Sequence, residues 1–339
     1  MISSDFPSYI AAKLISKLFY DPDNTLSLLG SKQVTYLTES FYEGYFNYTD
    51  KGAAGYIGIL TDYYDSCVYL AEDYTYLGDM TIPGVFVSNS TGDAIKEMMD
   101  NSENDISASL QMSGSLEEVD SGAVIGYLPG NSEETIMVQS HYDSITPGAV
   151  EDASGTACLL AMADFYSQIP EEDREKTLLF IAMDSHFSDY TTHDAVVAEL
   201  FRDDCSIVAN LCVEHIAKEY TVTSDGDLEE TGEIDPRIFF VSGSDALIQV
   251  VNEEIVRHGL DRSLVLGATL LGEDVFTDAN DFYQQGIALV SLISAPIYLY
   301  DMIDTADKIE KDALVPTVET LSDILWRLSE MPGEELQES

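Results

Sequence analysis

The chain is poor in positive charge. Its 339 residues include 15 lysines and arginines against 62 aspartates and glutamates, which gives a formal net charge of −47. A field of this sign repels nucleic acid and anionic membrane surfaces, so we expect neither as a partner. The simplest interpretation is a solvated surface that keeps the protein soluble and is screened at high salt. Attraction of cationic peptides is the alternative, and the charge by itself indicates no chemistry.

Cysteines and long apolar runs are also scarce. The four cysteines are spread along the chain: Cys67, Cys158, Cys205 and Cys212. They form no CxxC pair, which excludes a zinc knuckle and a disulfide framework and favours reduced thiols. The longest apolar runs, such as Thr177–Met183, have the length of a strand and not of a membrane span. Residues 1–7 lack the basic and apolar parts of a signal peptide, so we expect a cytoplasmic protein, or a secreted one if a leader has been removed.

The pattern of apolar and polar segments changes near residue 122. Upstream, short β-rich pieces alternate with acidic, tyrosine-rich loops, which predicts a small β-dominated domain. Downstream, apolar runs alternate with stretches of helical periodicity, which predicts a three-layer α/β/α sandwich around a mixed, mainly parallel sheet. The predicted units are a lead-in with a short helix over Ile10–Phe19 (1–32), the small β-rich domain (33–121), the α/β domain (122–332) and a frayed acidic tail (333–339).

Polar side chains follow several of the predicted strands. The strand over Thr135–Ser140 is expected to deliver His141 and Asp143 at its carboxyl end, and two later strands precede His186 and Glu214. Ligands of open α/β sheets gather beyond the carboxyl ends of the strands. The sequence therefore predicts that these side chains converge at one edge of the sheet.

Glu151 stands in a glycine-containing turn just before the next predicted helix. Histidine and carboxylate are ligands that zinc accepts, and a catalytic zinc ion keeps one position open for water. A divalent metal site made by His141, Glu151 and their neighbours is one interpretation. The other is that Asp152 or Ser154 caps the helix while His141 bonds the backbone.

These segments resemble a known family. HYDS at 141–144 and PGAVEDASG at 147–155 are similar to the signature of the bacterial leucyl-aminopeptidase-like family of co-catalytic zinc peptidases, which also includes glutamate carboxypeptidase and transferrin-receptor-like proteins. Further segments resemble the family in order along the chain: 176–185, 209–217, 277–287 and 300–309. The early segments 51–58 and 82–88 are similar to the protease-associated domain that such peptidases often carry. The resemblance covers about residues 40–330.

The resemblance implies a metal site that departs from the family pattern. The positions of the first metal's ligands are His141, Glu151 and Glu214, with glutamate at the two positions where the family has aspartate. Two positions that would serve a second ion hold Phe187 and Tyr300, and neither side chain is a good zinc ligand at neutral pH. The resemblance thus implies one zinc ion, with the second site lost.

The family's general base aligns with His186. A histidine there would serve either as a base near neutral pH or as a fourth ligand. Asp143 would hold the second nitrogen of His141 and fix its tautomer.

The other three histidines are predicted to lie outside the site. His215 follows Glu214 directly and should point to the opposite side of its strand, because neighbouring residues alternate between faces. His193 and His258 fall in predicted helices and are expected to face solvent.

Together these predictions favour a metal-dependent hydrolase of peptide or related amide bonds, aminopeptidase-like, with His186 and Asp143 as catalytic residues. A peptide or small amide would be its substrate, and the small domain would cover the cleft. The alternative is a catalytically inactive peptidase homologue that acts as a binding protein. The sequence indicates neither the substrate's side chains nor the oligomeric state.

Overall fold

The computed structural model describes residues 13, 15–26, 39–61, 64–66, 80–111, 113–115, 117–188, 190–202, 206–271 and 274–337. Cys67 and Cys205 lie outside these ranges. So do most of residues 10–14, the first half of the helix predicted over Ile10–Phe19. The two described cysteines, Cys158 and Cys212, are buried free thiols. Among the described helices, none is long and apolar enough to cross a membrane.

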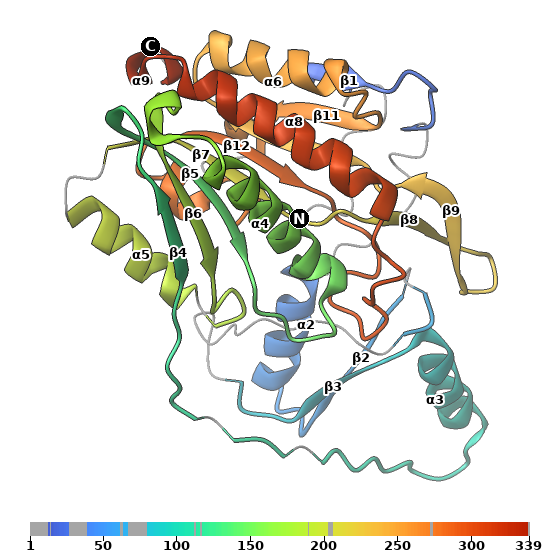
Figure 1. Ribbon diagram of the computed structural model, residues 1–339. Helices are drawn as coiled ribbons and strands as arrows, with labels where there is room; N and C mark the ends of the chain where they lie inside the picture. Colours follow the sequence, from blue (N-terminus) through green and yellow to red (C-terminus); the bar gives the residue numbers. More distant parts are fainter. Residues whose placement is uncertain are drawn as a thin grey trace.

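An eight-stranded mixed sheet forms the centre of the molecule (Figure 1), in the order β1-β11-β10-β12-β7-β5-β6-β4. Its strands are β1 (Leu18–Tyr20), β4 (Val124–Leu128), β5 (Ser132–His141), β6 (Lys176–Met183), β7 (Ile207–Val213), β10 (Arg237–Ser242), β11 (Ser263–Gly267) and β12 (Ala288–Ile293). The pairs β10–β11, β12–β7, β5–β7 and β5–β6 are parallel. The pairs β1–β11, β10–β12 and β4–β6 are antiparallel.

Helices cover both faces of this sheet. One layer contains α4 (Gly155–Ser167), α6 (Asp245–Arg257) and α8 (Lys311–Ser329), and the other contains α5 (Thr191–Arg202) and α7 (Asn280–Tyr283). Successive strand residues alternate between the two layers: Ile136 and Val138 pack in the α4–α6–α8 core, whereas Met137 packs with α5. Burial on both faces explains the continuous apolar runs. The predicted α/β sandwich is confirmed.

The two ends of the chain differ from the expected lead-in and tail. Leu18–Tyr20 pairs as an edge strand with β11, where a short helix was expected to run to Phe19. At the other end, Gly333–Leu336 forms the short helix α9. Its Leu336 is fully buried, and the N–H of Gly333 donates to the Glu134 carboxylate, so this segment packs instead of fraying.

A small lobe lies between β1 and β4 in the chain and below the sheet domain in Figure 1. It contains α2 (Glu39–Asp50), the parallel pair β2 (Tyr56–Ile59) and β3 (Gly84–Val87), and α3 (Asn89–Asn101). The sequence pattern predicts a helix over Ala94–Met99, and α3 begins earlier because the hydroxyl of Ser88 accepts a hydrogen bond from the N–H of Thr91 and caps it. The pattern also predicts a strand over Ile106–Met112, which does not form in its described residues, 106–111.

The lobe contacts the loops at the carboxyl edge of the sheet. The hydroxyl of Ser66 donates to Oδ2 of Asp301 at 2.6 Å, and Tyr64 packs in an apolar cluster with Val150 and Tyr298. A hairpin of β8 (Lys218–Val222) and β9 (Leu228–Ile234), which the sequence pattern did not predict, borders the same cluster through Tyr220. Val150 directly precedes Glu151, so the lobe and the hairpin pack around the turn that carries this carboxylate.

Candidate metal centre

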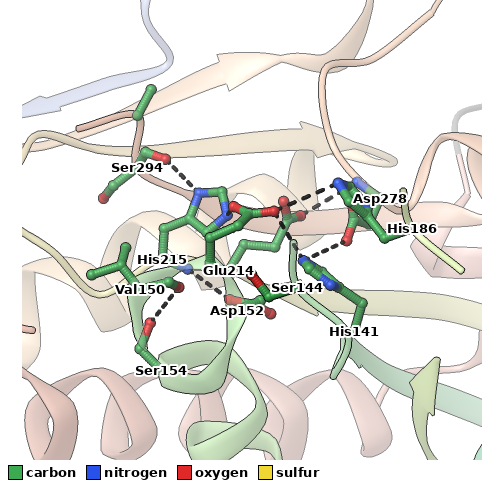
Figure 2. Close-up of polar contacts among 12 residues, drawn as sticks. His141, Ser144, Val150, Asp152, Ser154, His186, Glu214, His215, Asp278 and Ser294 are labelled. Carbon is green, nitrogen blue, oxygen red and sulfur yellow. Dashed lines mark hydrogen bonds and ion pairs between the residues drawn. The ribbon is translucent and has the colours of Figure 1, made fainter. Parts of the chain in front are cut away.

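Three neighbouring strands deliver the candidate residues to one edge of the sheet. Strand β5 ends at His141, β6 ends shortly before His186, and β7 ends immediately before Glu214 and His215. Because β5 is parallel to both β6 and β7, their carboxyl ends meet at this edge. Figure 2 shows His215 and Glu214 on one side of the site, with His141, His186 and Asp278 on the other.

Glu151 reaches the same edge from the turn between β5 and α4. The turn, Ala149–Ser154, is kinked at Glu151 and Asp152, whose backbone angles are not helical, and is preceded by Gly148, whose φ of 63° is left-handed. A Cβ at Gly148 would come within 2.5 Å of a neighbouring side chain, so glycine is needed there. The buried carboxylate of Asp304 accepts hydrogen bonds from two successive N–H groups, that of Glu151 at 3.1 Å among them. These contacts hold the backbone of Glu151 in place.

The Glu151 carboxylate lies at the centre of the site and is 1% exposed. Its Oε1 is 3.3 Å from Nε2 of His141 and 3.6 Å from Nε2 of His186. Its Oε2 contacts Nε2 of His215. Three imidazoles therefore present the same nitrogen to one carboxylate.

Two of these imidazoles are oriented by backbone carbonyls. Nδ1 of His141 is 3.0 Å from the carbonyl oxygen of Asp143 and 3.4 Å from its Oδ1, as the predicted role of Asp143 requires. Nδ1 of His215 is 2.6 Å from the carbonyl oxygen of Ser294. A carbonyl oxygen only accepts, so both Nδ1 atoms carry the hydrogen. Each Nε2 is then the nitrogen that faces Glu151, as a donor when the ring is protonated and as an available ligand atom when it is neutral.

Asp278 is a site residue to which the sequence analysis assigned no role. It is 4% exposed, and its Oδ1 lies 3.1 Å from Nδ1 of His186 while its Oδ2 lies 3.8 Å from Nε2 of His141. No strand directly precedes Asp278, so the positions of the strand ends do not predict it. The available signal was its place in the segment 277–287, which resembles the peptidase family.

The histidines of the site hold protons strongly when no cation is present. Burial lowers the pKa of His141, but Asp278, Asp143 and Glu151 outweigh it and raise that pKa well above the usual value. The pKa of His215 rises to about 10, because Glu151 overcomes the effect of burial. A metal ion at Nε2 would compete with these protons, so its binding would release them.

The buried carboxylates fall into two pairs. Burial raises the pKa of Glu151 and Asp278, but the adjacent imidazoles outweigh it and hold both values well below the ordinary range. Burial dominates at the other two and raises the pKa of Asp152 to about 7 and that of Glu214 to about 8. Glu151 and Asp278 are therefore the fully buried carboxylates of the site that stay charged at neutral pH.

Glu214 lies beside this group, but its carboxylate has other partners. Its Oε1 accepts a hydrogen bond from Thr277 at 2.9 Å and lies 3.4 Å from the backbone nitrogen of Asp278. It thereby supports the loop that carries Asp278. Its role as a metal ligand stays a prediction.

The donor set fits a zinc ion. His141, Glu151 and His186 offer ligand atoms that all lie within 4.8 Å of one another. Within the described residues, several buried atoms of the site contact one another as ion pairs but make no hydrogen bond of ordinary geometry: Nε2 of His141 and His215, both carboxylate oxygens of Glu151, Nδ1 of His186 and Oδ2 of Asp278. Unbonded buried polar atoms are costly, and imidazole nitrogen and carboxylate oxygen are zinc ligands.

Aromatic rings pack at the two positions where the sequence lacks ligands for a second ion. Phe187 and Tyr300 meet edge to face with centroids 5.7 Å apart, and Phe187 also packs against His186 at 4.5 Å. A phenyl ring offers no ligand atom. The side of His186 next to Phe187 is therefore apolar.

The remaining histidines lie where the sequence analysis did not place them. His215 points into the site because β7 has already ended, and its φ of 56° breaks the alternation of faces. His193, expected in solvent, is fully buried beside the ring of Tyr190, and burial lowers its pKa to about 4. The side chain of His258 is only 16% exposed, with Nε2 at 2.7 Å from Asp323.

Residues 123–185 match the sequence model of peptidase family M28. The matched segment runs from β4 to just past β6 and includes His141 and Glu151. No curated protein matches the chain.

Solved structures share the fold. BSAP, a zinc aminopeptidase from Bacillus subtilis, matches with a TM-score of 0.57 at 16% identity, covering 90% of this chain and 70% of that chain. A peptidase M28 precursor from Shewanella amazonensis SB2B gives 0.59 at 18% identity, covering 87% and 64%. An aminopeptidase from Aneurinibacillus sp. strain AM-1 gives 0.53 at 18%, covering 88% and 69%. The resemblance to zinc aminopeptidases is confirmed, whereas the protease-associated character of the small lobe stays a prediction.

Proposed function

We propose that the protein is a metal-dependent hydrolase of peptide or related amide bonds, of the aminopeptidase type, with a single zinc ion. The observation that carries this proposal is the convergence of three largely buried imidazoles on the buried Glu151 carboxylate. The match of residues 123–185 to a peptidase family and the zinc-aminopeptidase fold support it.

His141 and Glu151 would hold the ion. A bound zinc ion polarises the scissile carbonyl and lowers the pKa of a bound water. Asp143 keeps the hydrogen of His141 on Nδ1, which leaves Nε2 to bind. The rigid turn of Glu151, fixed by Asp304, keeps the carboxylate in place without rearrangement.

His186 would act as the general base. Its ring is stacked on that of His141, with centroids 4.2 Å apart and planes 12° apart. An imidazole binds a metal in its own plane, and two nearly parallel planes do not converge on one ion. The two rings therefore do not share an ion in this arrangement, which favours a base over a fourth ligand.

Asp278 orients that base. With its Oδ1 at Nδ1 of His186, Nε2 is the nitrogen free to take a proton from the attacking water and to return it to the leaving amine. The charge of Asp278 would stabilise the imidazolium formed in between.

One observation favours a second candidate function, a binding protein without catalysis. The rings of Phe187 and Tyr300 occupy positions where the resemblance implies ligands of a second ion. In this case the cleft would bind peptides without cleaving them.

Elemental analysis and a hydrolysis assay distinguish the two. We expect about one equivalent of zinc per chain, and hydrolysis of members of an aminoacyl 4-nitroanilide panel that a chelator abolishes and zinc restores. Two equivalents would contradict the single-ion site. No zinc after reconstitution, together with no hydrolysis, would favour the binding protein.

A further inference from the structure

His215 has the arrangement of a metal-binding histidine. Its Nδ1 donates to the carbonyl of Ser294, and its Nε2 is in close ion-pair contact with Oε2 of Glu151, in a side chain that is 3% exposed. His141 repeats this arrangement with the carbonyl of Asp143 and the other oxygen of Glu151. Metal-binding histidines almost always donate their second ring N–H to a carbonyl or carboxylate.

The backbone also directs His215 into the site. Its φ of 56° is left-handed, a conformation that is uncommon for a residue with a Cβ and that must be stabilised by its surroundings. The N–H of His215 donates to Oδ1 of Asp152 at 3.1 Å, and Oδ2 of the same carboxylate accepts from Ser140 at 2.5 Å. The turn is therefore fixed at the backbone as well as at the ring.

The neighbouring groups have other partners. Oε1 of Glu214 is bonded to Thr277 and lies close to the backbone of Asp278. The ring of His186 is stacked on that of His141, so these two do not share an ion in this arrangement. His141 and His186 both contact Oε1 of Glu151, whereas His215 contacts Oε2.

We propose that His215 is a ligand of the bound ion, in the place that the sequence predicts for Glu214. The ligand set is then His141, His215 and Glu151, with a fourth position open for water. Two imidazoles and one carboxylate suit zinc and other late first-row divalent ions, in preference to magnesium or calcium. This inference rests on the proposed function, because it assigns a ligand to the same ion.

The test compares zinc binding by three variants, His215→Gln, Glu214→Gln and His186→Gln, against the wild type. Zinc affinity is measured by competition with a chromophoric chelator, and X-ray absorption of the zinc-loaded proteins counts the imidazoles on the ion. Removing an outer partner of a ligand weakens metal binding about 10–100-fold. We expect His215→Gln to exceed about 100-fold and to reduce the count from two imidazoles to one. Glu214→Gln should stay within about 10-fold, and both controls should keep two imidazoles.

Each outcome decides the inference. One imidazole in the wild type, or full affinity with an unchanged count in His215→Gln, overturns it and leaves the proposed function standing. A wild type that binds no zinc overturns the proposed function itself. Should His215→Gln fail to fold in a circular-dichroism melt of the metal-free protein, the wild-type count and the retained zinc of Glu214→Gln still decide.

Discussion

Histidine and carboxylates meet in two regions of this molecule, and the two regions differ in their counter-charges. The sheet-edge cluster consists of His141, Glu151, His186, His215 and Asp278. The helix cluster lies on α6 and α8 and consists of Glu254, His258 and Asp323. Its ligand atoms fall within 4.8 Å of one another, as do those of His141, Glu151 and His186 in the sheet-edge cluster. By residue type and distance alone, both would be metal sites.

Arginines separate the two cases. In the helix cluster, the carboxylate of Glu254 forms ion pairs with Arg327 at 2.7 Å and with Arg257 at 3.2 Å. Arg257 also contacts Asp323. In the part of the chain that the structure describes, no lysine or arginine pairs with Glu151 or Asp278. A guanidinium already supplies the positive charge and the donors that an ion would bring. The comparison teaches that ligand types and distances do not by themselves mark a metal site, because a guanidinium can take the place of the ion.

The largest effect should come from matched amide variants of the two central glutamates. Glu151→Gln removes the charge that balances the ion, so we expect loss of the zinc equivalent and no measurable hydrolysis. Glu254→Gln weakens charged hydrogen bonds to partly exposed arginines, so we expect a loss of about 1–2 kcal/mol in the free energy of unfolding. Elemental analysis and urea unfolding of both variants measure the two effects.

Glu151→Gln should be the variant that loses zinc, and Glu254→Gln the variant whose free energy of unfolding falls through loss of its arginine contacts. Zinc content should be unchanged in Glu254→Gln, which leaves the sheet-edge cluster intact. If Glu254→Gln also lost its zinc, the ion would be in the helix cluster and the comparison would be wrong.

A smaller effect is expected within the sheet-edge cluster. His186→Gln removes the proposed base and keeps the zinc ligands, so kcat should fall about 10²–10⁴-fold while zinc content stays at one equivalent. Steady-state kinetics on the best nitroanilide substrate, with elemental analysis of the same sample, measure both. An unchanged kcat would exclude His186 as the base, and a loss of zinc would make it a ligand after all.

The fold could be predicted where burial is continuous along the chain. The sequence predicts strands over 207–213, 237–242 and 288–293, and β7, β10 and β12 occur at these residues. They could be predicted because apolar runs buried on both faces are bounded by polar residues. The edge strand β1 and the hairpin β8–β9 could not be predicted in this way. Their residues are mostly half-buried or exposed, and β1 depends on β11, which lies more than 200 residues away along the chain.

The site could be predicted only where a strand end delivers a side chain. His141 and His186 follow β5 and β6, and the resemblance pointed to Glu151. Asp278 comes from a loop, and His215 turns inward through a left-handed residue that strand periodicity cannot anticipate. The difference between the two clusters could not be predicted from the sequence either. Arg327 lies far from Glu254 along the chain and contacts it only through tertiary packing.

The smallest effect concerns His193, the one histidine that belongs to neither cluster. It is fully buried, neither of its ring nitrogens has a hydrogen-bond partner within the described chain, and burial lowers its pKa to about 4. The unfolded chain binds a proton near the ordinary pKa of about 6.5, so acid favours unfolding. Its contribution to stability is complete above about pH 6.5 and is lost as the pH falls toward 4.

His193→Phe removes this titration and keeps a buried ring. Relative to the wild type, we expect the variant to gain about 1–2 kcal/mol in the free energy of unfolding between pH 7 and pH 5, measured by urea unfolding at each pH. The difference between the two proteins should not change between pH 7 and pH 8, where His193 is neutral in both states, and this serves as the control. The same acid sensitivity in both proteins would mean that His193 gains a proton in the folded state, as the carboxylate-paired histidines of the sheet-edge cluster do.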